Sequence, residues 1–318
     1  MLAQGHTDDL DMSHPPRSEH GSAAQDLCSF FSSSTHWDTP WYSSQNPIPP
    51  LLEHTTDCTR THSMRWHGNT RTLTGGALFG DLSACWYTVE WSDHAANDTD
   101  KARRSAAFIP RPDSLSQDEL VAAHETYGET VAGFAEGYEG TGQWCARGEC
   151  WDLANEALKS FDQWDYVPKP LPCIGKTHGH LIFEGKAWGK NAETQQAGRW
   201  RGGDNLIRRG DIVQWKSVTI SEGRATFSLG FPDHTAIIVR DQQPLRTPRD
   251  AQPMRPAELG QLEVVEQSVQ SPPSRKVYQL AGMAAGELWI YRPVGMEAYL
   301  KVTFSASWPE GLEPATSA

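Results

Sequence analysis

Residues Gly148–Leu158 carry the stretch GECWDLANEAL. Its apolar side chains recur at helical spacing, at Trp151, Ala154 and Leu158, which predicts a helix with one buried face. Cys150 stands in the first turn, where unpaired N–H groups and the positive end of the helix dipole stabilise a thiolate. A cysteine in that setting can act as a nucleophile near neutral pH. The other interpretation is a small apolar residue that starts a core helix, and the downstream sequence has to decide between the two.

A histidine opens an apolar strand further along the chain, in the run HTAIIV at His234–Val239. An imidazole at the edge of a sheet can reach a helix N-terminus, take the proton of the Cys150 thiol and return it to a leaving amine. A later strand, predicted over Leu262–Val269, places Glu266 and Ser268 on one face because strand side chains alternate. Either of the two could hold the second ring nitrogen of His234 and fix its tautomer.

Residues close to the cysteine are candidates for binding a substrate. Gln143 could donate a hydrogen bond to an oxyanion, and the backbone N–H of Cys150 is the alternative donor. Trp144 and Trp151 could line a groove, although such rings are more often part of a core. Asp211 comes after a glycine and before an apolar run, and we interpret it as a structural residue.

Metal binding has one weak candidate in the sequence. Cys173, His178 and His180 lie close together, but no fourth ligand is evident, and a turn before a strand is the better interpretation. None of the six cysteines forms a CxxC pair, which also disfavours a zinc ribbon. We therefore expect no metal and no cofactor.

The composition of the chain limits the kinds of partner and the cellular location that we expect. The net charge of −12 argues against binding to a nucleic-acid phosphate backbone, since that needs clustered Lys and Arg. Residues 1–20 are polar and contain no apolar core of a secretory signal, and no apolar run approaches the length of a membrane span. We expect a cytoplasmic protein that does not bind membranes and whose cysteines are reduced thiols.

Composition also suggests how the chain is divided. Residues 1–33 are expected to be a disordered tail, 34–112 a β-rich segment ending in a linker (92–112), 113–306 the main domain and 307–318 a second tail. Within the main domain, a capping box at Ser116–Glu119 opens a helix, and 240–261 is expected to be a flexible insertion.

The aromatic and proline-rich segment Trp37–Pro50 has two interpretations. It is either a ligand for an SH3-like partner or a loop packed on its own domain, and we prefer the loop. Further strands are expected over 64–73, 77–91, 181–183, 211–218, 225–231, 234–239, 276–280, 287–291 and 299–304.

The order of these elements resembles the CHAP and NlpC-type papain-like amidases. Those families show a cysteine helix, then Gly-Asp, His-x-Ala-Ile-Val and Glu-x-Asn, and Ser268 stands here where they have Asn. Over residues 35–295 the chain also resembles the BBC/AIM-type cysteine-proteinase-fold domain of fungal myosin tail region-interacting proteins. That resemblance implies a papain-like fold, SH3 or actin-patch partners and a place in the cortical actin patch. It rests on the Trp37, Trp41 and Pro49-Pro50 segment, FGDLS at 79–83, GECW at 148–151, HGHLI at 178–182, RGDIVQ at 209–214, DHTA at 233–236, EQ at 266–267 and YRPV at 291–294.

We therefore predict an α+β protein with a papain-like or CHAP-like cysteine-proteinase fold, in which an N-terminal helix packs on an antiparallel sheet and a β-rich extension precedes it. The expected function is hydrolysis of an amide or isopeptide bond in a protein or peptide, with Cys150 as nucleophile and His234 as base. The alternative is a cytoskeletal adaptor that keeps the fold without catalysis.

Overall fold

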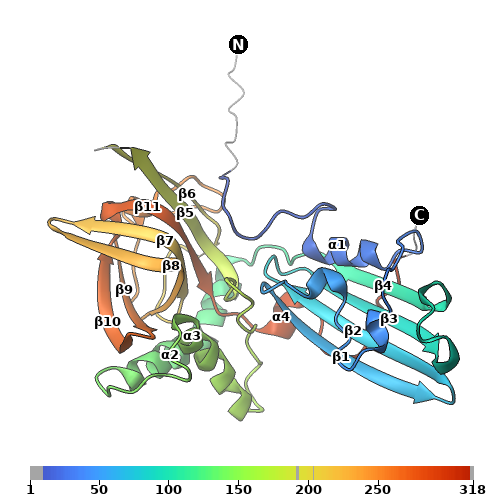
Figure 1. Cartoon of the computed structure of the whole chain (residues 1–318). Helices are drawn as coiled ribbons and strands as arrows, with labels where there is room; N and C mark the ends of the chain where they lie inside the picture. The colour runs from blue at the N-terminus through green and yellow to red at the C-terminus, as the bar shows by residue number, and fades with distance from the viewer. Residues whose placement is uncertain (1–9, 191–192, 203, 316–318) are drawn as a thin grey trace. The chain divides into compact units, whose positions relative to one another are not determined.

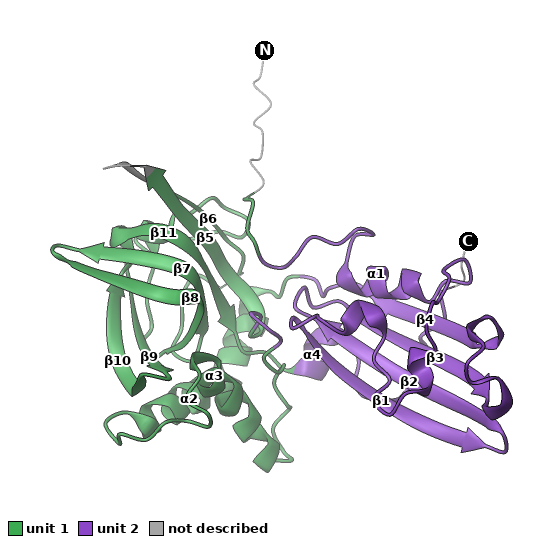
Figure 2. Ribbon diagram, viewed as in Figure 1, with its two compact units in different colours: residues 1–13, 114–173, 178–295 green, residues 14–113, 174–177, 296–318 purple. Residues whose placement is uncertain are grey.

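The structure is a computed structural model and describes residues 10–190, 193–202 and 204–315. It divides into two compact units, which Figure 2 shows in different colours. Unit 1 takes the chain up to residue 13, residues 114–173 and residues 178–295. Unit 2 takes residues 14–113, the short piece 174–177 and the chain from residue 296 onward. Each unit is therefore assembled from separate stretches of the sequence.

Unit 1 is built on an antiparallel sheet of seven strands in the order β10-β9-β8-β7-β11-β5-β6 (Figure 1). Trp200 near one edge and Tyr278 at the other join the same buried cluster, so the sheet curls around this core. The strands are β5 (His180–Lys190), β6 (Glu193–Trp200), β7 (Ile212–Glu222), β8 (Ala225–Ile238), β9 (Gln261–Ser268), β10 (Ser271–Gln279) and β11 (Met283–Arg292).

Two helices, α2 (Gln117–Tyr138) and α3 (Cys150–Lys159), cover the outer face of strands β8 and β9. The central strands are apolar on both faces: Ile238 and Val264 face the inner core, whereas Ile237 and Val265 pack against the helices. This two-sided burial explains why these strands read as continuous apolar runs. The antiparallel sheet behind a cysteine helix and the α+β class are as the sequence predicts.

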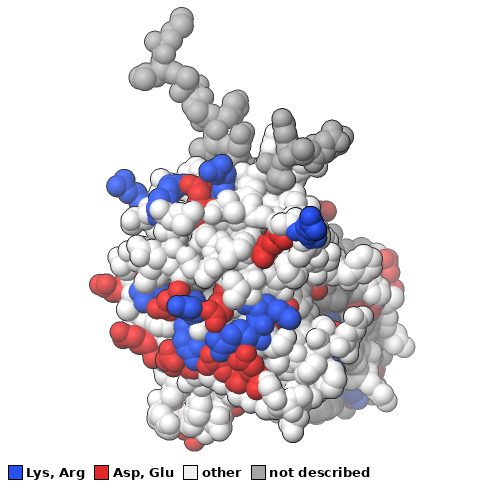
Figure 3. Space-filling view, turned by 90° about the vertical axis from the view of Figure 1, so that its left-hand side faces the viewer, with Lys and Arg blue, Asp and Glu red and all other residues white. Residues whose placement is uncertain are grey.

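Charged side chains tie α2 to the edge of the sheet. Arg275 on β10 contacts Glu136 and Glu139 on α2 and Glu263 on β9, and Arg209 also pairs with Glu136. Figure 3 shows this face of the molecule, where basic and acidic atoms lie intermixed. Hydrogen bonding to Arg209 lowers the pKa of Glu136 to about 2 against the effect of burial. Such a network holds α2 more firmly than isolated surface pairs would.

A buried ion cluster joins β7 and β11. Arg292, which is 0% exposed, donates two hydrogen bonds of 2.9 Å to the carboxylate of Asp211 and also pairs with Asp204. Asp204 in turn accepts from Arg208. Removing one member would leave a buried charge without its partner, which costs about 3–5 kcal/mol. Asp211 therefore has the structural role that its place after Gly210 suggests.

Unit 2 contains an antiparallel sheet of four strands in sequence order, β1 (Cys58–His67), β2 (Thr70–Phe79), β3 (Ala84–Ser92) and β4 (Arg103–Ile109). Helix α1 (Ala23–Phe30) packs on it together with Trp37, Trp41 and Tyr42, which are 3%, 7% and 0% exposed. The aromatic segment thus packs on its own unit, which is the interpretation that we preferred. Helix α4 (Met296–Leu300) and the residues after it return to this unit, where Trp86 Nε1 donates to the Ser305 carbonyl at 3.2 Å.

Several local predictions differ from the structure. The expected tail 1–33 contains α1, capped by Ser22 and buried through Leu27; residues 1–9 lie outside the described part. The linker expected over 92–112 contains β4, the expected strand 77–91 spans the turn between β2 and β3, and the strand expected at 299–304 begins in α4. The insertion 240–261 packs on unit 1 through the buried Met254 and Leu259, since apolar side chains anchor it.

Candidate active site

Helix α3 begins at Cys150, and a compact turn shapes the chain before it. Gly148 has φ +86°, and a Cβ atom there would lie 2.8 Å from Cδ1 of Trp144, so only glycine fits. The buried carboxylate of Asp152 accepts from the backbone N–H of Arg147 at 3.0 Å and from that of Glu149 at 3.2 Å. These bonds fix the turn, so the half-buried sulfur of Cys150 sits at a defined helix N-terminus.

His234 lies on β8, and Glu266 lies on the neighbouring strand β9. Nε2 of His234 is 2.9 Å from Oε2 of Glu266, and the two side chains are only 12% and 13% exposed. Cys150 lies close enough to the same imidazole to affect its protonation. Because Glu266 occupies Nε2, Nδ1 is the ring nitrogen that remains for the thiol. The structure thus brings a sulfur, an imidazole and a carboxylate together in that order.

The electrostatic setting of His234 follows from these neighbours. Burial by itself lowers the pKa of an imidazole, because it disfavours the charged form. Hydrogen bonding to Cys150 and Glu266, together with their charges, outweighs burial and raises the pKa of His234 to about 9. At neutral pH the imidazole in this arrangement carries a proton, which makes it a proton donor beside the sulfur.

Gln267, the residue after Glu266, holds the loop before the cysteine. Its side chain is 1% exposed, and Oε1 accepts from the backbone N–H of Cys145 at 2.9 Å. Nε2 donates to the carbonyls of Cys145 and Glu149 at 3.1 and 2.8 Å. Consecutive residues of β9 therefore fix both halves of the site, since one contacts the histidine and the next contacts the cysteine loop. Sequence reasoning missed this role of Gln267.

The other residues predicted for the site lie as follows. The hydroxyl of Ser268 accepts from the backbone N–H of Gln270 at 3.3 Å, so of the two predicted partners of His234 it is Glu266 that contacts the ring. Trp144, 44% exposed, donates from Nε1 to the Ser268 carbonyl at 2.8 Å. Gln143 is exposed in the preceding loop, and Trp151 is half-buried in the first turn of α3.

A second cysteine–histidine pair is buried elsewhere in unit 1. Nδ1 of His178 is 3.0 Å from the sulfur of Cys173, and its Nε2 is 3.1 Å from Oε1 of Gln214. The same amide oxygen accepts from the hydroxyl of Thr235 at 2.7 Å. Burial lowers the pKa of His178 to about 4 and raises the pKa of the Cys173 thiol, so both groups are neutral near pH 7.

Metal binding and membrane insertion can be checked over the described residues. Within residues 10–190, 193–202 and 204–315, His, Cys, Asp and Glu side chains form no group of three or more that could hold a metal ion. Across that same part of the chain, no helix is long and apolar enough to span a bilayer.

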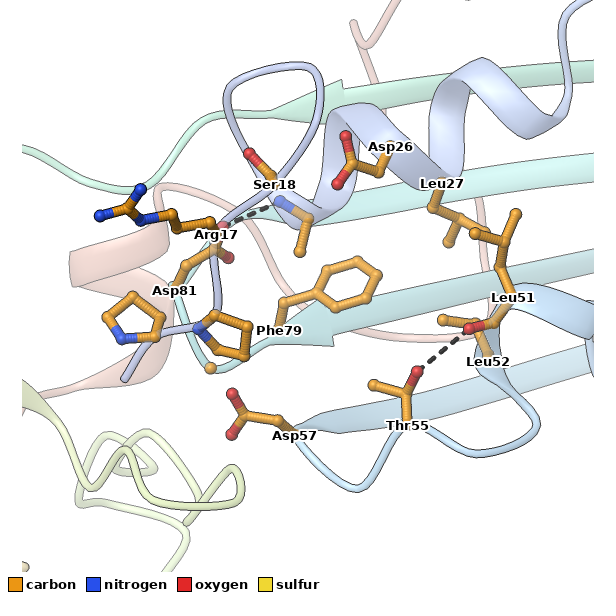
Figure 4. A pocket seen from close by; sticks show the side chains of 14 residues that line it. Arg17, Ser18, Asp26, Leu27, Leu51, Leu52, Thr55, Asp57, Phe79 and Asp81 are labelled. Carbon is orange, nitrogen blue, oxygen red and sulfur yellow. Dashed lines mark hydrogen bonds between the residues drawn. The ribbon is translucent and has the colours of Figure 1, made fainter. Parts of the chain in front are cut away.

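Unit 2 has a cavity of its own, about 190 Å³ in volume (Figure 4). Leu27 of α1, Leu52 and Phe79 form much of its apolar wall, and Asp57 and Asp81 lie at its edge. Burial raises the pKa of Asp57 to about 6. The residues that line this cavity include no cysteine and no histidine, so they cannot form a pair like that of Cys150 and His234.

Comparison with known protein families assigns the chain to a family with a known fold. The profile described as the AIM3/BBC1 cysteine-proteinase-fold domain matches residues 102–303 of the chain. The chain belongs to this family. The AIM3/BBC1 match covers all three side chains of the site, and it confirms the cysteine-proteinase fold predicted from the sequence.

A curated relative supports the same assignment. The chain is 32% identical over 174 residues to Altered inheritance of mitochondria protein 3 of Debaryomyces hansenii. The match covers 51% of this chain and 17% of the relative, so the chain spans less than a fifth of that protein's length. No solved structure gives a significant match to this AIM3/BBC1 family member.

Proposed function

We propose that the chain is a cysteine hydrolase that cleaves an amide or isopeptide bond in a protein or peptide. The observation that carries this proposal is the 2.9 Å contact of His234 with Glu266, with Cys150 at the N-terminus of α3 near enough to act on the same imidazole. The proposed reaction starts from a thiolate–imidazolium pair, and the carboxylate of Glu266 on the far ring nitrogen favours the imidazolium form of His234. Cys150 stands at the first position of α3, among the unpaired N–H groups of the helix N-terminus.

The reaction would follow from these positions. The Cys150 sulfur attacks the carbonyl carbon, a C–S bond forms, and the carbonyl electron pair moves to the oxygen, which becomes an oxyanion. His234 gives its proton to the leaving nitrogen as the C–N bond breaks, and this leaves a thioester on Cys150. Neutral His234 then takes a proton from water, whose oxygen displaces the sulfur and releases the acid.

The oxyanion needs hydrogen-bond donors near the sulfur. The amide nitrogen of Gln267 already donates to two carbonyls, so it is not available. The backbone N–H of Cys150 is at the first position of α3, where N–H groups have no partner within the helix. We therefore assign the backbone N–H of Cys150 to the oxyanion in this proposal and leave the exposed Gln143 as the second candidate.

Trp144 is the proposed contact for the substrate. Its ring is fixed against Gly148 and by its bond to Ser268, yet it is still 44% exposed. A rigid, partly exposed indole in the loop before the nucleophile suits an apolar part of a peptide. Trp144→Ala is expected to raise KM about 10-fold and to change kcat less, which would separate substrate binding from chemistry.

The test is alkylation of the folded chain by iodoacetamide, with each cysteine followed by mass spectrometry. Cys150 is expected to react fastest near pH 7 and to lose that advantage in His234→Ala, while Cys150→Ser removes the signal. A library of peptide amides and branched isopeptides then identifies cleavage that Cys150→Ser abolishes. If Cys150 of the native chain reacts no faster than a free thiol, the hydrolase proposal is wrong.

A second candidate is a non-catalytic interaction domain. The size of the relative favours it, because the matched region is 17% of a much longer protein and so occurs there beside other parts. In that case Cys150→Ser and His234→Ala should leave partner binding unchanged. Actin-patch or SH3-bearing proteins and a cytoplasmic location are the first partners and place to test under this proposal.

A further inference from the structure

Glu266 contacts two side chains, one through each of its carboxylate oxygens. Oε2 lies 2.9 Å from Nε2 of His234, and Oε1 accepts a hydrogen bond of 2.7 Å from the hydroxyl of Tyr278. Tyr278 lies on β10 and is 3% exposed. The tyrosine is therefore linked through a single carboxylate to the imidazole that faces Cys150.

The ring of Tyr278 is held on two sides by other aromatic rings. Its centroid is 6.0 Å from that of Trp215 and 5.8 Å from that of Phe227, both nearly perpendicular to it. Trp215 is itself the cross-strand neighbour of His234 in the pairing of β7 with β8. The hydroxyl is thus presented to Glu266 from a rigid part of the inner core.

The hydroxyl remains a donor over the whole physiological range. Burial first, and then the charge of Glu266, raise the pKa of Tyr278 above its ordinary value. An un-ionised phenol donates its O–H to a carboxylate oxygen. The contact therefore holds the carboxylate of Glu266 in one orientation, with Oε1 on Tyr278 and Oε2 turned to His234.

We infer that Tyr278 is a positioning residue of the hydrolase site: its hydroxyl orients Glu266, which orients His234 toward Cys150. This inference rests on the proposed function, because it assigns the tyrosine a role in the same reaction. It predicts a chain of four side chains from β10 to α3. Without the hydroxyl, the carboxylate is free to turn, and the imidazole loses a fixed partner.

The test compares Tyr278→Phe, which keeps the ring and its packing, with the wild-type chain. The rate of Cys150 alkylation at pH 7 is expected to fall about 10-fold, the usual effect of losing a hydrogen bond to a charged group. In an NMR titration, the midpoint of His234 should move down from about 9, since the carboxylate is less well placed. A tyrosine that served only to stabilise the fold would leave that midpoint unchanged.

Two controls make the result specific. Phe227→Leu disturbs the packing around Tyr278 but leaves its hydroxyl, so it should keep the wild-type alkylation rate within about twofold. In a Glu266→Gln background, adding Tyr278→Phe should have little further effect, because the two residues act through one contact.

The outcomes separate the two proposals. A native chain whose Cys150 is no faster than a free thiol overturns the hydrolase proposal, whatever Tyr278 does. A reactive Cys150 whose rate and His234 midpoint are unchanged in Tyr278→Phe overturns the inference alone and leaves the hydrolase proposal standing.

Discussion

Two cysteine–histidine pairs in the described part of unit 1 differ in their third partner and in their burial. His234 sits between Cys150 and the carboxylate of Glu266 and is 12% exposed. In the other pair, His178 sits between Cys173 and the neutral amide of Gln214 and is 0% exposed. The pKa of His234 is raised to about 9, whereas that of His178 is lowered to about 4.

The comparison teaches that contact between sulfur and imidazole does not by itself make a nucleophile. A buried pair whose imidazole contacts a neutral amide stays neutral, because desolvation disfavours both the thiolate and the imidazolium. A carboxylate on the far nitrogen and partial exposure reverse that balance for the imidazole of His234. Glu266 and the helix N-terminus, more than the cysteine itself, therefore distinguish the candidate site from a structural hydrogen bond.

The largest expected difference between the pairs is in chemical reactivity. In the native chain, iodoacetamide should alkylate Cys150 about 1,000-fold faster than Cys173, or more. Cys173 is 6% exposed and reacts only after local opening of the structure, which costs several kcal/mol in a core. Timed alkylation followed by peptide mass spectrometry measures both rates in one sample. Comparable rates would mean that burial and the third partner do not separate the two pairs.

The buried pair should make stability depend on pH. The folded-state pKa of His178 is about 4, below the unfolded value near 6.5, so the unfolded chain binds more protons between these values. Stability contributed by neutral His178 is complete above pH 6.5 and falls by about 3 kcal/mol as the pH drops through 4.

Urea unfolding followed from pH 7 to pH 4 measures this slope. His178→Gln should remove the share of His178 from this slope, while His180, whose pKa burial also lowers to about 4, keeps its own and Asp57, whose pKa burial raises to about 6, acts in the opposite direction. A slope that is unchanged in His178→Gln would show that His178 is not kept neutral by the fold.

Changing the third partner should make the candidate site resemble the buried pair. Glu266→Gln replaces the carboxylate by an amide of the same shape, like Gln214, and so removes a charge that raises the pKa of His234. The midpoint of His234 is expected to fall by about one unit or more, and Cys150 alkylation at pH 7 by about 10-fold. NMR titration of His234 measures the first effect. Glu266→Asp, which keeps the charge, serves as the matched control and should retain a raised midpoint.

The smallest expected effect tests whether the two pairs are independent. Thr235 follows His234 on β8, and its hydroxyl donates to Oε1 of Gln214, which contacts His178. Thr235→Val removes one buried hydrogen bond and should lower the free energy of unfolding by about 1 kcal/mol. The alkylation rate of Cys150 should stay the same. A loss of Cys150 reactivity in this variant would show that the two pairs are coupled.

Much of the candidate site was predictable from local patterns. A cysteine at a helix start, a histidine opening an apolar strand and a glutamate on a later strand are each visible in a few consecutive residues. Gln267 was not, because its role depends on carbonyls of a loop more than a hundred positions earlier. Tyr278 was not either, because it reaches Glu266 along the neighbouring strand and not from the directly opposite position.

The fold shows the same limit. Long periodic elements such as α2, β7 and β9 were predicted, since their apolar pattern is strong, whereas β8 is one strand where two were expected, over 225–231 and 234–239. Helix α1 was missed because only Ala24 and Leu27 are buried along its eight residues, so its stripe is too short to stand out. Strand β4 was missed because it lies in a polar stretch and carries two arginines at its start. Both α1 and β4 are therefore stabilised mainly by packing against the rest of unit 2, and not by their own sequence pattern.

The last part of the chain completes unit 2, although most of that unit comes from the first part of the sequence. Residues from 296 onward belong to it, and the short piece Ile174–Thr177 binds it through the Thr177 hydroxyl, which donates to the Gly80 carbonyl at 2.6 Å. During synthesis on a ribosome, about two hundred further residues are therefore made after the four-stranded sheet before the residues from 296 onward can pack in the same unit. An expression fragment cut at residue 113 would lack those residues and should be prone to aggregate, so the two units are best produced together.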